Sequence, residues 1–214
     1  MDPPFASRRP AVPAPVTDPA TPRPAASLLL LREGEAGPEV LMGTRGAGHR
    51  FMPNRLVFPG GAVDPEDHAA PCATPLRAEV RRRLAHGADA SLVHALAIAA
   101  ARELAEETGL SLGTPPPLDV LDDLCRALTP AAQPVRFDAR FFVAPAGTVT
   151  GPLAGSGELE GLRFYPVAEA LALDLALVTR SVLGRLMEWR TMTAAERAAR
   201  PHLPVLVERA WQTP

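Results

Sequence analysis

Three carboxylates in the segment Arg102–Leu110 are spaced so that they could act together on one substrate. Glu103, Glu106 and Glu107 stand at positions 0, +3 and +4 of an expected helix, and this spacing places them on one helical face. Their negative charges repel one another unless a cation lies between them. Mg²⁺ and Mn²⁺ prefer such oxygen ligands and often retain phosphate oxygens, so the pattern indicates metal-assisted phosphate chemistry. The alternative is an exposed acidic helix end with Arg102 as an intrahelical partner.

Two arginines and two glycines precede this segment and add a second candidate function. Arg45 and Arg50 lie in a stretch that ends in the string Phe-Pro-Gly-Gly, with Gly60 and Gly61 as its last residues. Arginine can bind phosphate through paired hydrogen bonds, and glycine allows a close backbone approach. We interpret the stretch as a clamp for a diphosphate; the alternative leaves both arginines as solvated loop charges.

Together these strings resemble the Nudix hydrolase signature. Its second half, Arg-Glu-U-x-Glu-Glu-x-Gly-U with U apolar, matches at every specified position from Arg102 to Leu110. Its first half departs, because Gly61 and Arg102 are 102 − 61 = 41 positions apart where the signature allows 14, which leaves an insertion of 41 − 14 = 27 residues. The first Glu of the signature therefore falls on Asp67 when counted from Gly61, or on His94 when counted from Arg102. Both assignments, and the absence of any replacement, stay open.

The stretch 41–61 is similar to the extended motif of coenzyme A diphosphatases within this family. Arg45, Arg50 and Phe-Pro-Gly-Gly are in register, whereas Gly46 and Asn54 stand where that motif has Ser and Gly. The resemblance is thus closest to coenzyme A diphosphatase-like members with a long insertion in the signature. It implies a small-molecule diphosphate substrate, first coenzyme A or an acyl derivative, and next ADP-ribose or another nucleotide sugar. A catalytically silent nucleotide sensor is the non-enzymatic alternative.

The resemblance also implies roles for the acidic residues. Glu103, Glu106 and Glu107 would bind Mg²⁺ or Mn²⁺, which neutralises charge on the diphosphate and lowers the pKa of water. Glu103 would orient or deprotonate the attacking water, with Glu158 as a rival base. Arg102 would hold Glu103 in place rather than contact the substrate.

Two further assignments depend on strands near the site. Arg140 lies in an expected strand and either points toward the substrate or pairs with charge near Asp138 on an exposed sheet face. Glu158 and Glu160 both precede a later strand, and Glu158 is the preferred candidate for metal binding or for the base.

The elements that must position these residues form an α/β/α sandwich, as the resemblance implies, with a mixed sheet and an extra inserted helix. Alternation and turn residues predict strands over 26–31, 39–44, 56–58, 136–144 and 162–165, and leave 118–128 as strand or helix. Apolar spacing predicts helices over 76–85, 91–108, 167–173 and 178–189. In the first of these, the spacing leaves residues 81–83, all arginine, on the solvated face.

The carboxylate-bearing helix is expected to run from Ser91, its candidate N-cap, to Thr108 and to stop at Gly109. Its alanine-rich middle suits close packing against a sheet. Around it, the chain is expected to divide into a Pro/Ala-rich flexible arm over 1–24, one domain over 25–189 with its insertion at about 62–91, and a weakly patterned C-terminal tail over 190–214.

Composition narrows the possible partners of the 214-residue chain. The net charge of −2 argues against nucleic acid binding by a general basic surface. No apolar run approaches the ~20 residues that span a bilayer. Cys72 and Cys125 lack metal-type spacing, so a reduced, cytoplasmic setting is expected. Many family members pair as homodimers, and the inserted helix or the arm could supply such a contact.

Overall fold

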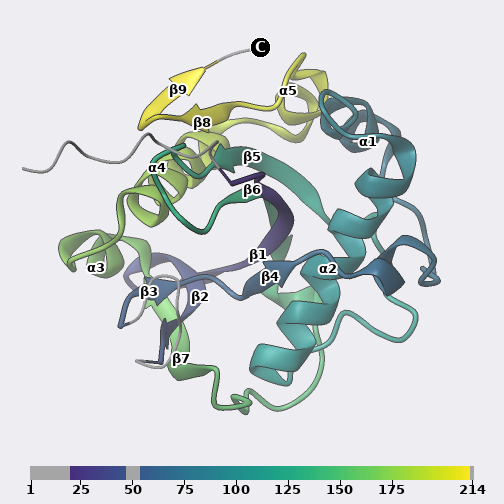
Figure 1. Cartoon of the computed structure of the whole chain (residues 1–214). Helices are drawn as coiled ribbons and strands as arrows, with labels where there is room; N and C mark the ends of the chain where they lie inside the picture. Colours follow the sequence, from purple (N-terminus) through teal and green to yellow (C-terminus); the bar gives the residue numbers. More distant parts are fainter. Residues whose placement is uncertain (1–19, 47–53, 213–214) are drawn as a thin grey trace, which may run out of the picture.

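One mixed β-sheet organises the protein, as seen in a computed structural model that describes residues 20–46 and 54–212 (Figure 1). The hydrogen-bonded strand order is β3-β2-β1-β6-β5-β8-β9, while β4 pairs with β1 and β7 pairs with β2. The strands are β1 (Arg23–Gly34), β2 (Gly37–Arg45), β3 (Leu56–Val57), β4 (Gly60–Ala62), β5 (Asp122–Leu128), β6 (Phe137–Pro145), β7 (Leu159–Pro166), β8 (Val205–Val207) and β9 (Ala210–Gln212).

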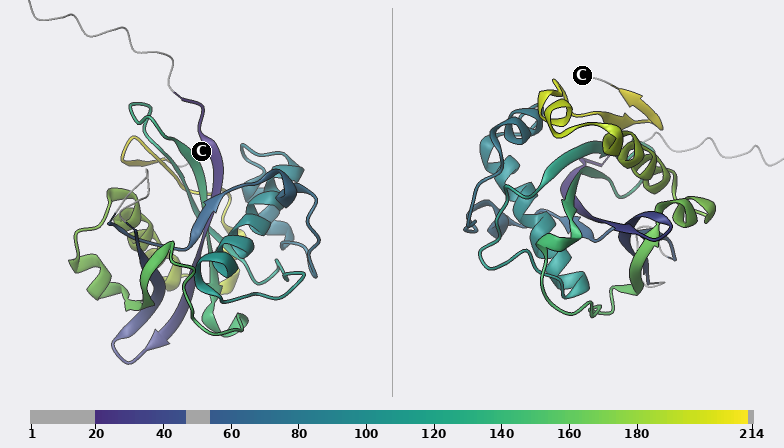
Figure 2. Two further views of the ribbon diagram at one scale, coloured as in Figure 1. Left: turned by 60° about the horizontal axis from the view of Figure 1, so that its bottom comes forward. Right: turned by 180° about the vertical axis from the view of Figure 1, so that it is seen from behind.

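Helices cover both faces of this sheet, which gives the predicted α/β/α arrangement (Figure 2). They are α1 (Ala78–Leu84), α2 (Ala90–Thr108), α3 (Val167–Ala172), α4 (Leu177–Thr191) and α5 (Ala194–Ala199), with short 3₁₀ turns η1 (Pro65–His68) and η2 (Ala146–Thr148). Within the described residues, no helix has both the length and the apolar content needed to cross a membrane.

The central strand β1 is buried on both faces, and its leucines alternate between two cores. Leu28 and Leu30 pack in the cluster that α1 and α2 cover, whereas Leu29 packs in the cluster that α4 covers. In the neighbouring strand, Phe142 joins the first cluster and Phe141 the second. The alternation predicted for strand 136–144 is therefore confirmed, because successive side chains of a strand point to opposite faces.

Helix α2 carries the acidic motif, and its ends are set by two residues. Asp89, not Ser91, is the N-cap, because its side chain accepts a hydrogen bond from the backbone N–H of Leu92 at 2.8 Å. The helix ends at Gly109, whose φ of 74° is left-handed, a conformation that glycine adopts without strain. The predicted stop is confirmed and the predicted start is one position late.

The inserted helix is present as α1, but one expectation about its arginines is wrong. Arg81 and Arg82 are exposed, whereas Arg83 is only 1% exposed. Its Nε donates to Asp123 Oδ2 at 2.8 Å, and its Nη1 donates to the carbonyl of Ala198 at 3.1 Å. A buried carboxylate on β5 therefore draws Arg83 inward, and the helical spacing of apolar residues does not reveal this.

One middle segment and both terminal segments of the chain differ from the sequence expectation. Residues 118–128, left open between strand and helix, form β5 at their end. The stretch expected as a tail contains α5 and the strands β8 and β9, and β8 pairs in parallel with β5. Of the expected arm, residues 1–19 lie outside the described part, while Arg23 and Pro24 already belong to β1.

Candidate active site

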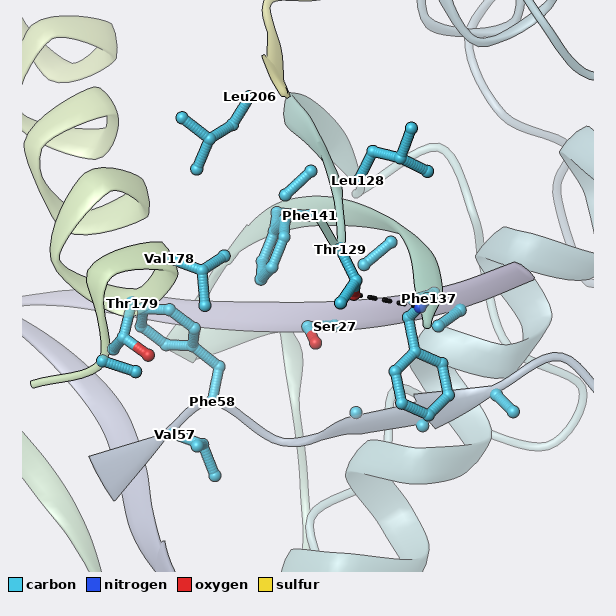
Figure 3. Close-up of a pocket in the computed structure, with 18 of the residues that line it drawn as sticks. Ser27, Val57, Phe58, Leu128, Thr129, Phe137, Phe141, Val178, Thr179 and Leu206 are labelled. Atoms are coloured by element: carbon cyan, nitrogen blue, oxygen red, sulfur yellow. Dashed lines mark hydrogen bonds between the residues drawn. The ribbon is translucent and has the colours of Figure 1, made fainter. Parts of the chain in front are cut away.

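A cavity of about 680 Å³ lies between the N-terminal end of α4 and the strands β1, β5 and β6 (Figure 3). Its wall is completed by the strands β4 and β8, the last turns of α2, the residue before β7 and the β8–β9 turn. Figure 3 shows the rings of Phe58 and Phe141 facing the space, and Ser27 on β1 also lines it. The cavity is large enough for a nucleotide-sized ligand.

Three carboxylates line this cavity. Glu103 and Glu107 come from α2, and Glu158 stands immediately before β7. Burial is the main cause that raises the pKa of Glu103 and of Glu107, and charge repulsion from Glu158 adds to the shift of both. Glu106 does not line the cavity; its side chain is 59% exposed.

Glu107 has the most unusual environment of the three. It is 1% exposed, and its Oε2 accepts a hydrogen bond from the backbone N–H of Gly60 at 2.8 Å. Its Oε1 is buried without a hydrogen bond and lies 3.6 Å from Nη2 of Arg45. Burial raises the pKa of Glu107 to about 7, although the Gly60 N–H and Arg45 act in the opposite direction. A buried, unsatisfied anionic oxygen is costly unless a cation or a donor completes it.

The double glycine is required by the geometry of this wall. A Cβ on Gly61 would overlap the carboxyl group of Glu103, and a Cβ on Gly60 would overlap the carbonyl of Ala26. Gly60 also has a φ of +155°, which side-chain-bearing residues rarely adopt. The two glycines thus let β4 approach α2 closely enough for Gly60 to bind Glu107. Their contact with a substrate remains a prediction.

Arg102 connects the helix to the start of the insertion. Its Nε and Nη2 each donate to Asp67 at 3.0 Å. Its Nη1 donates to Oε1 of Glu103 at 2.8 Å and to Oε2 of Glu106 at 3.1 Å. Arg102 does not line the cavity. The geometry supports the structural role expected for it, since one guanidinium orients two of the three motif carboxylates.

The contacts of Arg102 help to compare Asp67 and His94, the two candidates for the place of the first Glu of the signature. Asp67 is 2% exposed and pairs with Arg102, whereas His94 shares a hydrogen bond at 2.8 Å with the carbonyl of Ala70. Neither residue lines the cavity. The pairing with Arg102 favours Asp67 over His94 as the replacement, and this assignment remains a prediction.

The motif carboxylates fit a cation, although they are not gathered as a finished ligand set. In the described part of the chain, no three His, Cys, Asp or Glu side chains converge closely enough to hold a metal ion. Arg102 takes one oxygen each of Glu103 and Glu106. Their other oxygens, Oε2 and Oε1 respectively, and Oε1 of Glu107 have no hydrogen bond to the described residues. Each carboxylate thus retains one free oxygen, the donor type that Mg²⁺ and Mn²⁺ prefer.

Two arginines expected at the substrate have different outcomes. Arg45 lines the cavity, and its Nε is buried without a partner. Arg140 does not line it: this side chain is 1% exposed, and its Nη1 lies 2.7 Å from Oδ1 of Asp138. The substrate-facing expectation for Arg140 is corrected, because its position in β6 turns it toward the opposite sheet face from Phe141. The partner near Asp138 was among the expected alternatives, but the pair is buried rather than exposed. Arg50 lies outside the described residues.

Sequence reasoning missed much of the remaining cavity wall. Phe58, Thr129, Phe141 and the β8–β9 turn residue Arg209 come from separate parts of the chain. The alternation in 136–144 grouped Phe141 with Phe137 and could have indicated one shared face. No local pattern connected Arg209 to the site, because the last residues are weakly patterned.

The comparisons with known proteins agree with this geometry. Residues 94–186 match the NUDIX domain family, and no curated protein matches the chain. A NUDIX hydrolase from Alicyclobacillus acidocaldarius is similar, with 26% identity, a TM-score of 0.64 and coverage of 86% of this chain and 98% of that chain.

Two more distant structures share the fold. A MutT NUDIX hydrolase from Burkholderia pseudomallei has 20% identity and a TM-score of 0.51, and covers 78% of this chain and 99% of its own. The NUDIX domain of Shewanella oneidensis NrtR, crystallised with ADP ribose, has 18% identity and a TM-score of 0.51, with 81% and 90% covered. Nudix proteins typically use divalent metals. The intact Arg102–Leu110 motif lies on α2 within residues 94–186, so this part of the chain matches the NUDIX domain family, and the fold is similar to that of a NUDIX hydrolase.

Proposed function

We propose that the protein hydrolyses a nucleoside diphosphate linked to a second moiety, in a reaction that requires Mg²⁺ or Mn²⁺. The observation that carries this proposal is the free, buried Oε1 of Glu107 at the wall of a nucleotide-sized cavity. Glu103 and Glu158 add negative charge to the same wall. Such a wall repels a diphosphate by itself and accepts one when a cation is present.

Glu103, Glu106 and Glu107 would hold the ion through their free oxygens. When bound, the ion supplies positive charge against the charge that develops on the diphosphate, and it acidifies water. Arg45 supports the other side of the substrate, because its unpartnered Nε can donate to a phosphate oxygen.

Glu103 is the first candidate for the general base. Its Oε1 is fixed by Arg102, which leaves Oε2 to receive a proton from the attacking water. Burial raises the pKa of Glu103, an effect that Arg102 partly opposes, and a raised pKa improves a carboxylate as a base near neutral pH. Glu158 is the rival, because it lines the same wall and is exposed.

Coenzyme A or an acyl derivative is the first candidate substrate. The motif resemblance over 41–61 and the position of Arg45 in the cavity support it. ADP-ribose is the second candidate, since the related NrtR domain was crystallised with it. A panel of diphosphates incubated with Mg²⁺ and a phosphatase would rank them by phosphate release. No turnover of any coenzyme A compound would remove the first candidate.

The test of the metal site is Glu106→Gln. This variant keeps the shape of the side chain but removes its charge, and we expect metal-dependent turnover to fall by about a hundredfold or more, with an unchanged melting temperature. Glu35→Gln, in the exposed β1–β2 turn, is the matched control and should keep full activity. Unchanged activity in Glu106→Gln would defeat the assignment.

A nucleotide sensor is the second candidate function. One observation favours it: the described acidic residues form no ready-made ligand set, and Arg102 holds Glu106 away from the cavity. A sensor would be stabilised against heat by a nucleotide without forming product. The cytoplasmic location and the homodimer inferred from the sequence remain predictions of the same proposal.

A further inference from the structure

The cavity is chemically divided along its length. Its acidic lining residues are Glu103, Glu107 and Glu158. They share one end, because Glu107 binds Gly60, the Glu103 carboxyl group lies against Gly61, and the residue after Glu158 pairs with Arg45 beside Glu107. Its other described lining charges, apart from Arg45 beside Glu107, are Arg23 and Arg209. A ligand that fills the cavity therefore meets carboxylates at one end and arginines elsewhere.

Strand register places these arginines at the far end. Ser27 pairs with Gly60, the residue that binds Glu107, and Arg23 lies four residues earlier on β1. At about 3.3 Å per residue, four residues correspond to about 13 Å along the strand. Arg23 pairs with Phe137, and Thr129 accepts a hydrogen bond from the Phe137 N–H (Figure 3). This separation leaves room for a nucleoside between the two ends.

Arg209 reaches the same end from the C-terminal hairpin. Leu206 on β8 pairs with Ala127 on β5, and the chain then turns at Glu208 and Arg209 before β9. Oε1 of Glu208 accepts a hydrogen bond from the N–H of Ala131, just beyond Thr129. This contact ties the turn to the loop after β5, so Arg209 and Thr129 line the same end of the cavity.

These arginines have no acidic partner. Within the described residues, neither Arg23 nor Arg209 forms an ion pair, and both are exposed. Most other arginines in the described part of the chain pair with a carboxylate, as Arg83 and Arg102 do. Two cations without a counter-ion on one cavity rim favour an anionic ligand group.

Aromatic side chains line the cavity beside the carboxylate end, since Phe141 and Gly60 both pair with Ser27. The rings of Phe58 and Phe141 are 6.2 Å apart and meet edge to face at 80°. Val178 and Leu206 face the same space (Figure 3). Such a wall suits a flat ring, because bases bind well against aromatic side chains.

We propose that Arg23 and Arg209 form a subsite for an additional phosphate on the ribose of the substrate nucleoside, whose base lies against Phe58 and Phe141. The substrate class is therefore a diphosphate of a ribose-phosphorylated nucleoside. This inference rests on the proposed function, because the anhydride must lie at the carboxylates. Arg23, Phe58 and Arg209 all lie outside the family match over 94–186, so that match does not include the subsite.

The experiment uses pairs of substrates that differ by one ribose phosphate: coenzyme A with dephospho-coenzyme A, and NADPH with NADH. We expect the wild-type protein to have at least about tenfold higher kcat/KM for the phosphorylated member of a pair, through a lower KM. The double variant Arg23→Gln, Arg209→Gln should lose this preference and keep kcat. Arg82→Gln, on the exposed face of α1, is the matched control and should retain the preference.

A binding measurement separates this inference from the proposed function. Two pairs of ligands that lack the anhydride, adenosine 3′,5′-bisphosphate with AMP and adenosine 2′,5′-bisphosphate with AMP, are titrated calorimetrically into each protein in metal-free buffer with EDTA. A phosphate preference in binding that disappears in the double variant supports the subsite even if no compound is hydrolysed, in which case only the proposed function fails. Equal affinity within each pair, or a preference that survives the double substitution, overturns the subsite even where turnover is intact.

Discussion

At the scale of single residues, the site depends on the buried carboxylate of Glu107, whose ionised form destabilises the folded protein. Glu107 is buried with only the Gly60 N–H as a hydrogen-bond donor and Arg45 as a distant ion-pair partner. Burial is the dominant cause of its raised pKa, and the repulsion of Glu103 and Glu158 adds to it. A bound cation requires the ionised carboxylate of Glu107. Without the metal, this ionised carboxylate lowers the stability of the folded protein. Ion binding and folding are coupled through this one group.

This coupling predicts how stability varies with pH. Between about pH 4.5 and about pH 7 the folded protein retains a proton on Glu107 that the unfolded chain has released, so the contribution of this group to stability falls as pH rises through that window. In EDTA, Glu107→Gln should remove this decline and stabilise the protein at pH 8 by about 3 kcal/mol relative to the wild type. Urea denaturation at pH 5 and at pH 8 measures both.

The control for this prediction is Glu35→Gln, whose side chain is exposed. It should keep the wild-type pH dependence. A Glu107→Gln protein that is less stable than the wild type at pH 8 would show that the carboxylate is stabilised rather than strained by its surroundings.

At the scale of elements, α2 positions most of the acidic wall. Its last two turns carry Glu103 and Glu107, and its end also fixes the loop that leads to Glu158. The N–H of Ala154 donates to the carbonyl of Thr108 at 2.9 Å, and the N–H of Ser156 donates to the carbonyl of Glu107 at 3.4 Å. These bonds satisfy carbonyls that a helix end leaves free. The same hydrogen bonds thus complete the end of α2 and position the loop that carries Glu158.

The opposite end of α2 gives a test that separates stability from activity. Asp89→Ala removes the side-chain cap on Leu92 and should cost about 1 kcal/mol, which for a protein of this size lowers the melting temperature by about 2–4 °C. The carboxylates lie several turns away, so kcat/KM should not change. Calorimetry and a turnover assay check the two outcomes.

Ser91→Ala is the comparison variant, because Ser91 was the cap expected from the sequence. Its hydroxyl lies 2.8 Å from Nδ1 of the exposed His68 and does not cap the first backbone N–H groups of the helix. A larger loss of stability in Ser91→Ala than in Asp89→Ala would show that Ser91 is the N-cap of α2.

At the scale of the whole molecule, a buried ion-pair network joins the insertion, the sheet and the C-terminal segment. Arg83 on α1 pairs with Asp123 on β5 and donates to Ala198 on α5. Arg200 also contacts Asp123, donating to its carbonyl at 2.5 Å. The network fixes α5 just before the chain enters β8. The insertion and the C-terminal hairpin are therefore stabilised by the same carboxylate.

Removing the central arginine should destabilise the entire domain. Arg83→Ala leaves Asp123 buried with its main partner lost, and we expect a loss of about 3–5 kcal/mol in the free energy of unfolding. Arg82→Ala, its exposed neighbour, should change it by less than about 0.5 kcal/mol. Chemical denaturation measures both variants, and equal effects would mean that Arg83 is as solvated as the helical spacing first indicated.

The sequence by itself determined the features that depend on local spacing. The acidic face of α2, its stop at Gly109, the alternating faces of β6 and the β1–β2 hairpin all follow from patterns within a few residues. Helix and strand periods encode such features directly, so the family resemblance and the α/β/α class could be predicted before the fold was seen.

Only the tertiary structure decided which distant groups meet. Arg102 pairs with Asp67 across 35 residues and Arg83 with Asp123 across 40, and the far end of the cavity combines the first strand with the last hairpin. Arg140 turned out to be paired within the sheet for the same reason. Two oppositely charged side chains attract each other wherever folding brings them together. The spacing of nearby residues in the sequence cannot predict which distant residues will come into contact.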